Sequence, residues 1–431
     1  MRIPRVIGVF AIVAGCSGTA DVDTVTRAFV GATIFDGTEA PRVSDAVLVV
    51  RDGRVAALGP RETTEIPADA EVIDGAGRFI IPGLINAHGH VGGTVGLESG
   101  PEFFSREIIR EQLALYASYG VTTVVSLGGD GEADIAVRRE QMDAIPDIAR
   151  IYVAGPVLAP ATREEAYEMV AEAAGKGVDW IKIRIDDNLG QGRKMPEPVY
   201  RAVIDEATAR GLPVAAHVVY LEDAHGVVQA GARLLAHSVR DLPVDQALIQ
   251  AMRERNVCLS PTLTREVSTF VYGERPAFFD DPFFLRAADP AVIQALEDPV
   301  RQQRVRADAA ARYWEAALPT AEHNLEVLSQ AGVGIAFGTD TGPAGRFQGY
   351  FEHLELWMMV RAGLSPEQAL RSATGEAARC MGLDSELGTL TPGKWADFLV
   401  LETDPLAEIR NTRTIESVWI GGRRRGSSGS N

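Results

Sequence analysis

The segment Arg78-Phe-Ile-Ile-Pro-Gly-Leu-Ile-Asn-Ala-His-Gly-His90 is an apolar run that ends in two histidines one residue apart. Alternate residues of a strand point to the same side, so His88 and His90 are expected to project together. Two imidazoles at the end of one strand can hold one face of a metal ion. A His-x-His pair in a loop is more often solvated, but the apolar residues 80–83 place this pair at the end of a buried strand.

The chain has the composition of an ordinary globular protein. It has 431 residues, of which 46% are hydrophobic and 23% are charged. This length predicts one large domain and a smaller one, because single cores stop growing near ~250–300 residues. The net charge of −17 argues against a nucleic-acid surface and favours solubility.

The first residues are typical of an export signal. Two arginines precede a short apolar run, and Val13-Ala-Gly-Cys16 resembles a lipobox. We therefore predict a lipoprotein signal peptide at 1–16, a polar tether at 17–25, and a periplasmic or cell-surface protein lipidated at Cys16. The apolar run is too short to span a bilayer as a helix. A plain secretory signal cut nearby, or a misassigned start codon, would explain the same residues.

The chain has three cysteines, too few for a disulfide framework once Cys16 is assigned to the lipid. Cys258 falls in a predicted buried strand and Cys380 in a late helix. We expect two separate core thiols.

Both ends of the chain have a β pattern. Residues 45–51 and 54–59 flank Asp52-Gly53, which is a strong hairpin signal. Residues 26–82 and 384–423 together predict one small composite β-sandwich domain. A polar tail at 424–431 is expected to be disordered.

Between these segments, strands alternate with amphipathic helices, so the fold class is α/β. Eight β/α units predict a TIM barrel, (β/α)8, over residues 83–383. The expected strands are 83–90, 121–127, 149–157, 178–185, 213–219, 233–238, 257–263 and 333–340. The expected helices are 105–119, 163–176, 198–210, 221–230, 244–255, 320–330, 351–362 and 366–382.

The connection at 264–319 is too long for a simple loop, and its first part carries Phe270, Tyr272, Phe278, Phe279, Phe283 and Phe284. At this side of the predicted strands it could form a lid or a wall of the substrate pocket. A helical insertion that packs the rings into its own core fits the pattern equally well.

Further candidate ligands end other predicted strands, where barrel enzymes place their active sites. His217, His237 and Asp340 close the fifth, sixth and eighth strands. In the fourth strand, alternation sends three isoleucines outward and Lys182 inward. A lysine inside a barrel is costly unless it is neutral, paired or linked to a metal.

At this point the chain resembles the amidohydrolase superfamily, in its imidazolonepropionase-related and Xaa-Pro-dipeptidase-like branch. The resemblance covers nearly everything after the tether. The segments that carry it are 82–90, Asp179-Trp-Ile-Lys182, Ala216-His217, Ala236-His-Ser238, Gly338-Thr-Asp340, 369–374 and 388–397.

The resemblance implies two divalent metal ions, usually Zn²⁺. His88, His90 and Asp340 would hold one ion, and His217 and His237 the other. Lys182 would bridge the ions as a carbamate formed with CO2. A hydroxide between the ions would be the nucleophile, and Asp340 would pass its proton to the leaving nitrogen.

The function implied is metal-dependent hydrolysis of an amide-type C–N bond in a dipeptide or an N-acyl amino acid-like substrate. The alternative is opening of a cyclic amide or deamination of a small heterocycle at the same site. A non-catalytic surface lipoprotein is the third reading, and the filled ligand positions argue against it. The expected partner is a small molecule, with membrane contact only through the lipid anchor. A homo-oligomer is possible, and the oligomeric state stays open.

Several assignments stay open. Lys182 could instead pair with Asp186 or Asp187, which would leave a mononuclear, deaminase-like site at His88, His90, His217 and Asp340. Tyr220 and Arg240 are candidate substrate contacts. Related dipeptidases often carry a tyrosine where this chain has Val219, which puts the role of Tyr220 in doubt, and a surface ion pair is the commoner use of Arg240. His225, His323 and His353 are expected to be structural.

Overall fold

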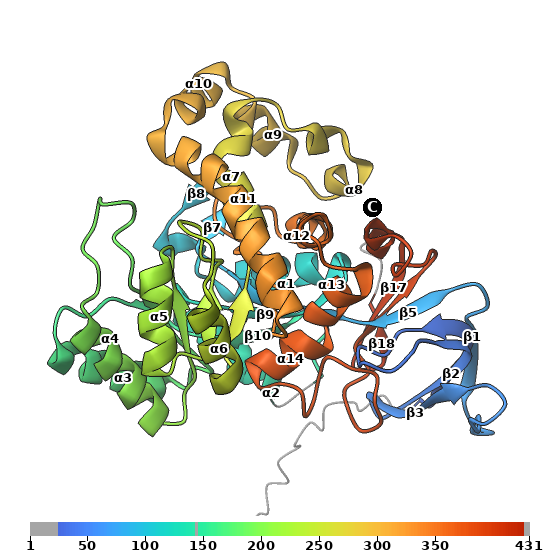
Figure 1. Cartoon of the computed structure of the whole chain (residues 1–431). Coiled ribbons are helices and arrows are strands. Elements are labelled where there is room, and N and C mark those ends of the chain that lie inside the picture. Colours follow the sequence, from blue (N-terminus) through green and yellow to red (C-terminus); the bar gives the residue numbers. More distant parts are fainter. Residues whose placement is uncertain (1–24, 143–144, 426–431) are drawn as a thin grey trace, which may run out of the picture.

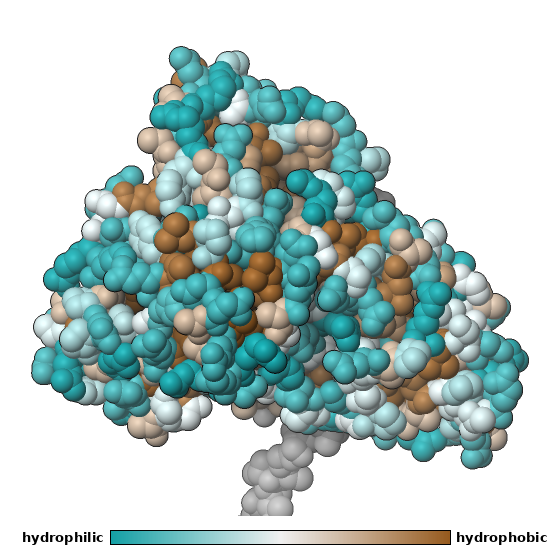
Figure 2. Space-filling view, in the orientation of Figure 1, coloured by the Kyte–Doolittle hydropathy of each residue, from teal (hydrophilic) through white to brown (hydrophobic). Residues whose placement is uncertain are grey.

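The computed structural model describes residues 25–142 and 145–425. The predicted signal peptide, most of the tether and the end of the predicted tail lie outside the described residues. Within the described ranges, no helix is both long and apolar enough to cross a membrane. Figure 2 shows a face that is largely hydrophilic, in keeping with the net charge of −17.

An eight-stranded sheet combines strands from both ends of the chain, to one side of the remaining structure (Figure 1). The C-terminal β16 pairs antiparallel with β5, which leads directly into the histidine segment. Phe29, Phe398 and Trp419 pack edge-on and stacked in its core. Its strands are β1 (Arg27–Ile34), β2 (Val43–Arg51), β3 (Arg54–Pro60), β4 (Glu71–Asp74), β5 (Phe79–Pro82), β16 (Phe398–Leu401), β17 (Ile415–Ile420) and β18 (Arg423–Arg424).

Parallel strands form two further sheets, ordered β10-β9-β6 and β11-β12-β13-β14-β15. Single parallel bridges join Leu259 to Ile335 and Gly89 to Thr341, so the segment 335–341 runs between the two sheets. The strands are β6 (Leu84–Gly89), β9 (Val121–Ser126), β10 (Arg150–Val153), β11 (Val157–Leu158), β12 (Ile181–Arg184), β13 (Val214–His217), β14 (Leu234–Ala236) and β15 (Cys258–Ser260). A separate hairpin joins β7 (Thr94–Val95) and β8 (Glu98–Ser99).

Helices follow most of these strands, so the predicted α/β class is confirmed. They begin at polar caps such as Ser105 and Thr162, and several end at a left-handed glycine such as Gly177. They are α1 (Arg106–Ser118), α2 (Glu132–Met142), α3 (Arg163–Lys176), α4 (Glu197–Ala209), α5 (Leu221–Ala230), α6 (Gln246–Arg255), α11 (Ala309–Gln330), α12 (Tyr350–Arg361), α13 (Pro366–Ser372) and α14 (Gly375–Met381). Single-turn helices lie at Pro101–Phe103 and Ile409–Arg413.

The side chains of the predicted fourth strand, 178–185, alternate between the two faces as expected. Ile181 and Ile183 pack with the helices in the main core, whereas Trp180 lies among the small residues Ala215 and Ala236 of the neighbouring strands. Two boundaries differ from prediction. The predicted strand 149–157 divides into β10 and β11, and α11 begins at Ala309 with Pro319 inside it.

The insertion forms a helical layer over the strand ends (Figure 1). Its elements are α7 (Leu263–Phe270), α8 (Pro282–Leu285), α9 (Pro290–Leu296), α10 (Pro299–Ala307) and single turns at Val271–Gly273 and Ala277–Asp280. Phe279 and Phe284 pack into a cluster with Tyr119, Tyr350 and Phe351, so the rings share a core with α12. Phe284 also lines a cavity of about 290 Å³ that reaches the loop after residue 341. The rings are therefore packed in a core shared with α12, and the role of the insertion as a wall of the substrate pocket stays a prediction.

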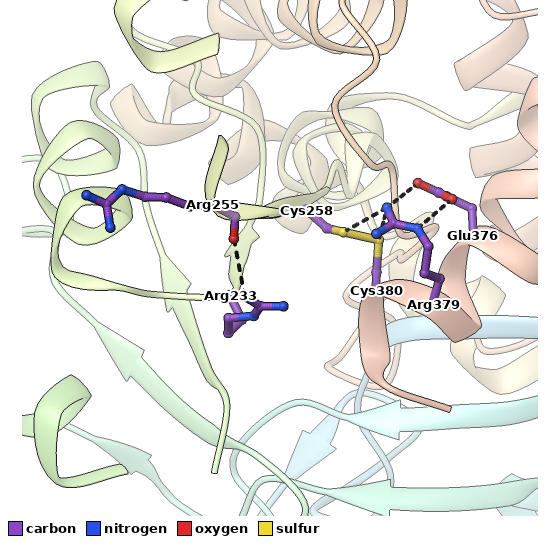
Figure 3. The surroundings of a disulfide bond; sticks show 6 residues. All are labelled: Arg233, Arg255, Cys258, Glu376, Arg379 and Cys380. Carbon is purple, nitrogen blue, oxygen red and sulfur yellow. Dashed lines mark hydrogen bonds and ion pairs between the residues drawn. A yellow bond between two sulfur atoms is a disulfide. The ribbon is translucent and has the colours of Figure 1, made fainter. Parts of the chain in front are cut away.

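Cys258 and Cys380 form a disulfide, so the prediction of two separate thiols is wrong (Figure 3). Their Cα atoms lie 6.0 Å apart although 122 residues separate them in sequence. The pairing requires α14 to lie beside β15. These segments are distant in sequence, so no local sequence pattern predicts the contact. A Cβ on Gly334 would lie 2.7 Å from the Cys258 sulfur, so this glycine leaves the bond its space.

We expect the Cys258→Ser variant to be less stable than the wild type by about 2–4 kcal/mol, because the disulfide closes a long loop. Urea unfolding with and without a reductant measures this difference. The double variant with Cys380→Ser is the control, since a reductant should not change its stability. Alkylation of both thiols in the folded, unreduced protein would contradict the pairing.

Candidate metal centre

His88 and His90 project from the end of β6, and their surroundings fix the ring of His90. The Nδ1 atom of His90 lies 2.8 Å from the carbonyl oxygen of Gly128. A carbonyl only accepts hydrogen bonds, so Nδ1 carries a proton, and Nε2 is the ring atom that can bind a metal ion. This Nε2 lies 2.7 Å from Oδ1 of Asp340. An imidazole nitrogen and a carboxylate oxygen are both metal-ligand atoms, so their approach fits a metal ion beside them.

Asp340 lies near the end of the segment 335–341, which runs between the two parallel sheets. Its φ of 59° is left-handed, and its backbone N–H donates to the carbonyl of His88 at 2.6 Å. Strained backbone of this kind clusters at functional sites. Burial favours the neutral acid, but Arg346, whose Nη1 lies 2.5 Å from Oδ2, and the two imidazoles hold the pKa of Asp340 well below its usual range. The carboxylate is therefore a charged donor. His88, His90 and Asp340 form a group that could bind a metal ion.

Three further side chains complete the cluster. The Nζ of Lys182 lies 3.2 Å from Nε2 of His88. The His237 ring lies between His88 and His217, with centroid distances of 4.8 Å and 4.2 Å. The structure thus brings together all six residues that the sequence predicted as ligands.

Burial sets the protonation of this cluster. It lowers the pKa of His88, His217 and His237 well below the usual value, so these rings are neutral donors. It also lowers the pKa of Lys182 to about 7. A metal site needs neutral imidazoles, and this donor set provides them.

Two glycines make room for the cluster. A Cβ on Gly338 would lie 2.8 Å from the Cβ of His88, and a Cβ on Gly128 would lie 2.9 Å from the Cγ of Lys182. Gly128 also has a φ of +106°, which favours glycine. The small residues of the predicted eighth strand therefore serve to seat His88 beside Asp340.

Two buried glutamates of α12 support the site, and sequence reasoning missed both. Glu352 accepts hydrogen bonds from Asn86, Thr339 and Thr341 at 2.6–2.8 Å. Glu355 caps the start of α7 by accepting from the backbone N–H groups of residues 263 and 264, both at 2.7 Å. Acidic residues within the otherwise apolar helix pattern at 351–362 were the available signal.

The predicted substrate contacts have other partners. Tyr220 donates its hydroxyl to Asp187 at 2.9 Å. Arg240 is fully buried beside Glu266, with Nε 3.0 Å from Oε1, so a surface ion pair is the wrong description. Asp186 pairs with Arg184 and with His217, both at 3.2 Å. The two aspartates proposed as rival partners of Lys182 are therefore engaged elsewhere.

The remaining histidines lie apart from the cluster. His353 is buried in α12, with its ring nitrogens 2.9 Å from Thr412 Oγ1 and 2.8 Å from the carbonyl of Tyr119. Burial lowers its pKa to about 3. His225 pairs with Asp245 at 3.0 Å, and His323 is exposed.

Comparisons with known proteins place this arrangement in a family. A model of the Amidohydrolase family matches residues 79–425. Imidazolonepropionase from Shewanella baltica is 25% identical over 439 residues, 88% of this chain and 92% of that protein. Ochratoxinase from Aspergillus niger is 26% identical over 282 residues, 63% of this chain and 51% of that protein.

Solved structures are similar over almost the whole chain. A candidate prolidase from Bifidobacterium longum is 27% identical, with a TM-score of 0.75 that covers 95% of this chain and 96% of that one. A Xaa-Pro dipeptidase with bound methionine is 20% identical, with a TM-score of 0.75 over 93% and 99% of the two chains, and shows the likeness of fold. With the family model covering most of the chain, this protein belongs to the amidohydrolase family and is an enzyme that hydrolyses carbon–nitrogen bonds.

Proposed function

We propose that this enzyme cleaves the amide bond of a dipeptide or an N-acyl amino acid-like substrate at a centre of two divalent metal ions, preferably Zn²⁺. The observation that carries the proposal is the approach of His90 Nε2 to Asp340 Oδ1 at 2.7 Å, beside Lys182. The names of two similar proteins, a candidate prolidase and a Xaa-Pro dipeptidase, support an amide-type substrate.

The proposal includes a closed (β/α)8 barrel over residues 83–383. The bridges from Ile335 to β15 and from Thr341 to β6 support closure on one side. On the other side, the backbone N–H of Asp179 donates to the carbonyl of Val153 at 2.8 Å, between β10 and the start of β12. The ligands would then converge at the carboxyl ends of the strands, where barrel enzymes place their active sites.

In this centre His88, His90 and Asp340 would hold one ion, and His217 and His237 the other. When bound, the ions would lower the pKa of a water molecule and polarise the scissile carbonyl. Of the six side chains, only Asp340 is an anion in the folded chain, so two divalent ions require a second negative ligand.

Lys182 would supply that second negative charge as a carbamate. Its neutral amine would attack the carbon of CO2, so that an N–C bond forms as one C–O π bond breaks, and the nitrogen would lose a proton to water. The product would be an anion whose two oxygens are available to the ions. Burial lowers the pKa of Lys182 to about 7, so a large fraction of the amine is neutral at physiological pH.

Asp340 would carry the proton. Its Oδ2 is held by Arg346, which leaves Oδ1 directed toward the two imidazoles of His88 and His90. From this position the carboxylate would accept a proton from the attacking water, and the resulting acid would donate it to the leaving nitrogen. The fixed carboxylate avoids the entropic cost of placing a free base.

A second candidate is opening of a cyclic amide or deamination of a small heterocycle. The similarity to imidazolonepropionases over 88% of the chain is the observation that favours it. The same six residues would serve both reactions, so the products distinguish them. Amide cleavage releases an amino acid or a peptide fragment, and deamination releases ammonia.

We expect the zinc-loaded protein to hydrolyse members of a panel of Xaa-Pro and other dipeptides and N-acyl amino acids, and Lys182→Ala to reduce kcat/KM at least about 100-fold. Added short carboxylic acids should partly restore activity and bound zinc, because they replace the carbamate oxygens. Zinc per chain and amine release are the measurements. Lys194→Ala is the control. Lys194 pairs with Asp223 and lies over the Tyr220 ring, so its replacement should leave zinc content and kcat/KM unchanged.

Unchanged zinc content in Lys182→Ala would contradict the carbamate. Turnover of cyclic amides alone, or release of ammonia, would replace the proposed reaction with the second candidate.

We further propose that the protein is exported and tethered by a lipid on Cys16. The Cys258–Cys380 disulfide supports export, because disulfides persist in oxidising compartments. Cys16→Ser should release the protein from the membrane fraction into the soluble fraction. Cys16→Ser protein that stays in the washed membranes would contradict the tether.

A further inference from the structure

Three arginines lie after three consecutive parallel segments. Arg240 follows β14, Arg265 lies in α7 after β15, and Arg346 follows the segment 335–341. Carboxyl ends of neighbouring parallel strands lie on the same edge, so these guanidinium groups gather beside the candidate metal ligands. Only Arg346 has a role in the reaction proposed above.

The first turn of α7 is fixed to the candidate ligands. Thr262 has a left-handed φ of 52°, and its hydroxyl lies 2.6 Å from Nδ1 of His237. The Thr264 hydroxyl donates to the carbonyl of Thr339, next to Asp340, at 3.3 Å. Arg265 donates its backbone N–H to the carbonyl of Thr262 at 3.0 Å. Arg265 is therefore held within one helical turn of two ligands.

Arg240 and Arg265 share one carboxylate. Arg265 Nη1 donates to Oε2 of Glu266 at 2.7 Å, while Arg240 Nε lies 3.0 Å from Oε1 in a contact not aligned as a hydrogen bond. Both guanidinium groups also lie against the ring of Trp314, at 4.8 Å and 4.3 Å from its centroid. Two buried positive charges thus face one negative charge.

The hydrogen bonding of this arginine cluster is also incomplete. The side chains of Arg240, Arg265 and Glu266 are 0%, 9% and 1% exposed. Nη2 of Arg240 has no hydrogen-bond partner among the described residues. A buried donor without an acceptor is costly, so the cluster lacks one acceptor group.

The nearest other carboxylates are already engaged. Asp340 pairs with Arg346 and His90, and Asp186 with Arg184 and His217. Burial lowers the pKa of Arg265, but the charges of Glu266 and then Asp340 more than offset this, so the pKa is raised. Asp340 of the candidate metal centre is thus close enough to Arg265 to stabilise its charged form.

We propose that Arg265 binds a carboxylate group of the substrate and so selects acids over their neutral analogues. A guanidinium has five N–H donors in a planar fork that matches a carboxylate, and Arg265 commits one of them to Glu266. Arg240 and Trp314 act as positioning residues, because they hold Glu266 and the Arg265 plane. The inference rests on the proposed function only for the identity of the bond that is cleaved. The binding of a carboxylate by Arg265 does not depend on that reaction.

The test compares two ligands that cannot be hydrolysed. Both are a dipeptide whose peptide bond is reduced to a secondary amine, one with a free C-terminal carboxylate and one with a carboxamide. Calorimetric titration of the zinc-loaded protein should give about 100-fold tighter binding of the carboxylate form. Arg265→Met keeps most of the volume against Trp314 and should remove this preference.

Arg286→Met is the matched control. Arg286 also lies on aromatic rings, 3.7 Å from the centroid of Tyr119 and 4.3 Å from that of Phe283, and it should leave the preference unchanged. An equal preference in Arg265→Met and the wild type overturns the inference. So does a wild type that binds both forms equally or takes inorganic phosphate in preference to the acid.

The two proposals fail separately. If no amide is hydrolysed but the Arg265-dependent preference is measured, the reaction proposed above is wrong and the acid-binding role of Arg265 stands. If amides are hydrolysed and carboxamide and carboxylate forms bind alike, the reaction stands and the role of Arg265 is wrong.

Discussion

Oδ1 of the Asp340 carboxylate and Nε2 of His90 face each other at 2.7 Å, and the Gly128 carbonyl fixes the orientation of the ring by accepting from Nδ1. The rest of the site is arranged around this pair. Burial lowers the pKa of His88, His217 and His237, so these imidazoles are neutral, and it lowers the pKa of Lys182 to about 7. Most of the cluster is buried, while the side chain of His90 stays 23% exposed.

Buried hydrogen bonds, a disulfide and the pairing of the terminal strands hold the candidate ligands in place. Glu352 ties Asn86 to Thr339 and Thr341 on either side of Asp340, and Glu355 fixes the start of α7. At the opposite ends of the strands, the Cys258–Cys380 disulfide joins β15 to α14. The terminal strands β5 and β16 pair directly before the histidine segment, so both ends of the chain position its first ligands.

Much of this arrangement could be predicted from the sequence because strand alternation is local. The inward phase of Lys182 and the strand-end positions of His217, His237 and Asp340 required only a period of two. The assignment of these residues as metal ligands stays a prediction, as do the domain boundaries. The disulfide and the roles of Glu352, Glu355 and Arg265 could not be predicted, because each depends on contacts between segments distant in sequence. Arg240 was misjudged for the same reason, since its partner Glu266 lies in α7, after the next strand of the sheet.

In the proposed centre, six side chains hold two metal ions and Lys182 carries CO2. Native mass spectrometry of the intact protein, loaded with zinc in bicarbonate buffer, measures both. The predicted result is a mass that exceeds the apoprotein by two zinc ions and one CO2, with the CO2 lost on gentle acidification. One zinc ion per chain and no added CO2, at saturating zinc and bicarbonate, would contradict the account.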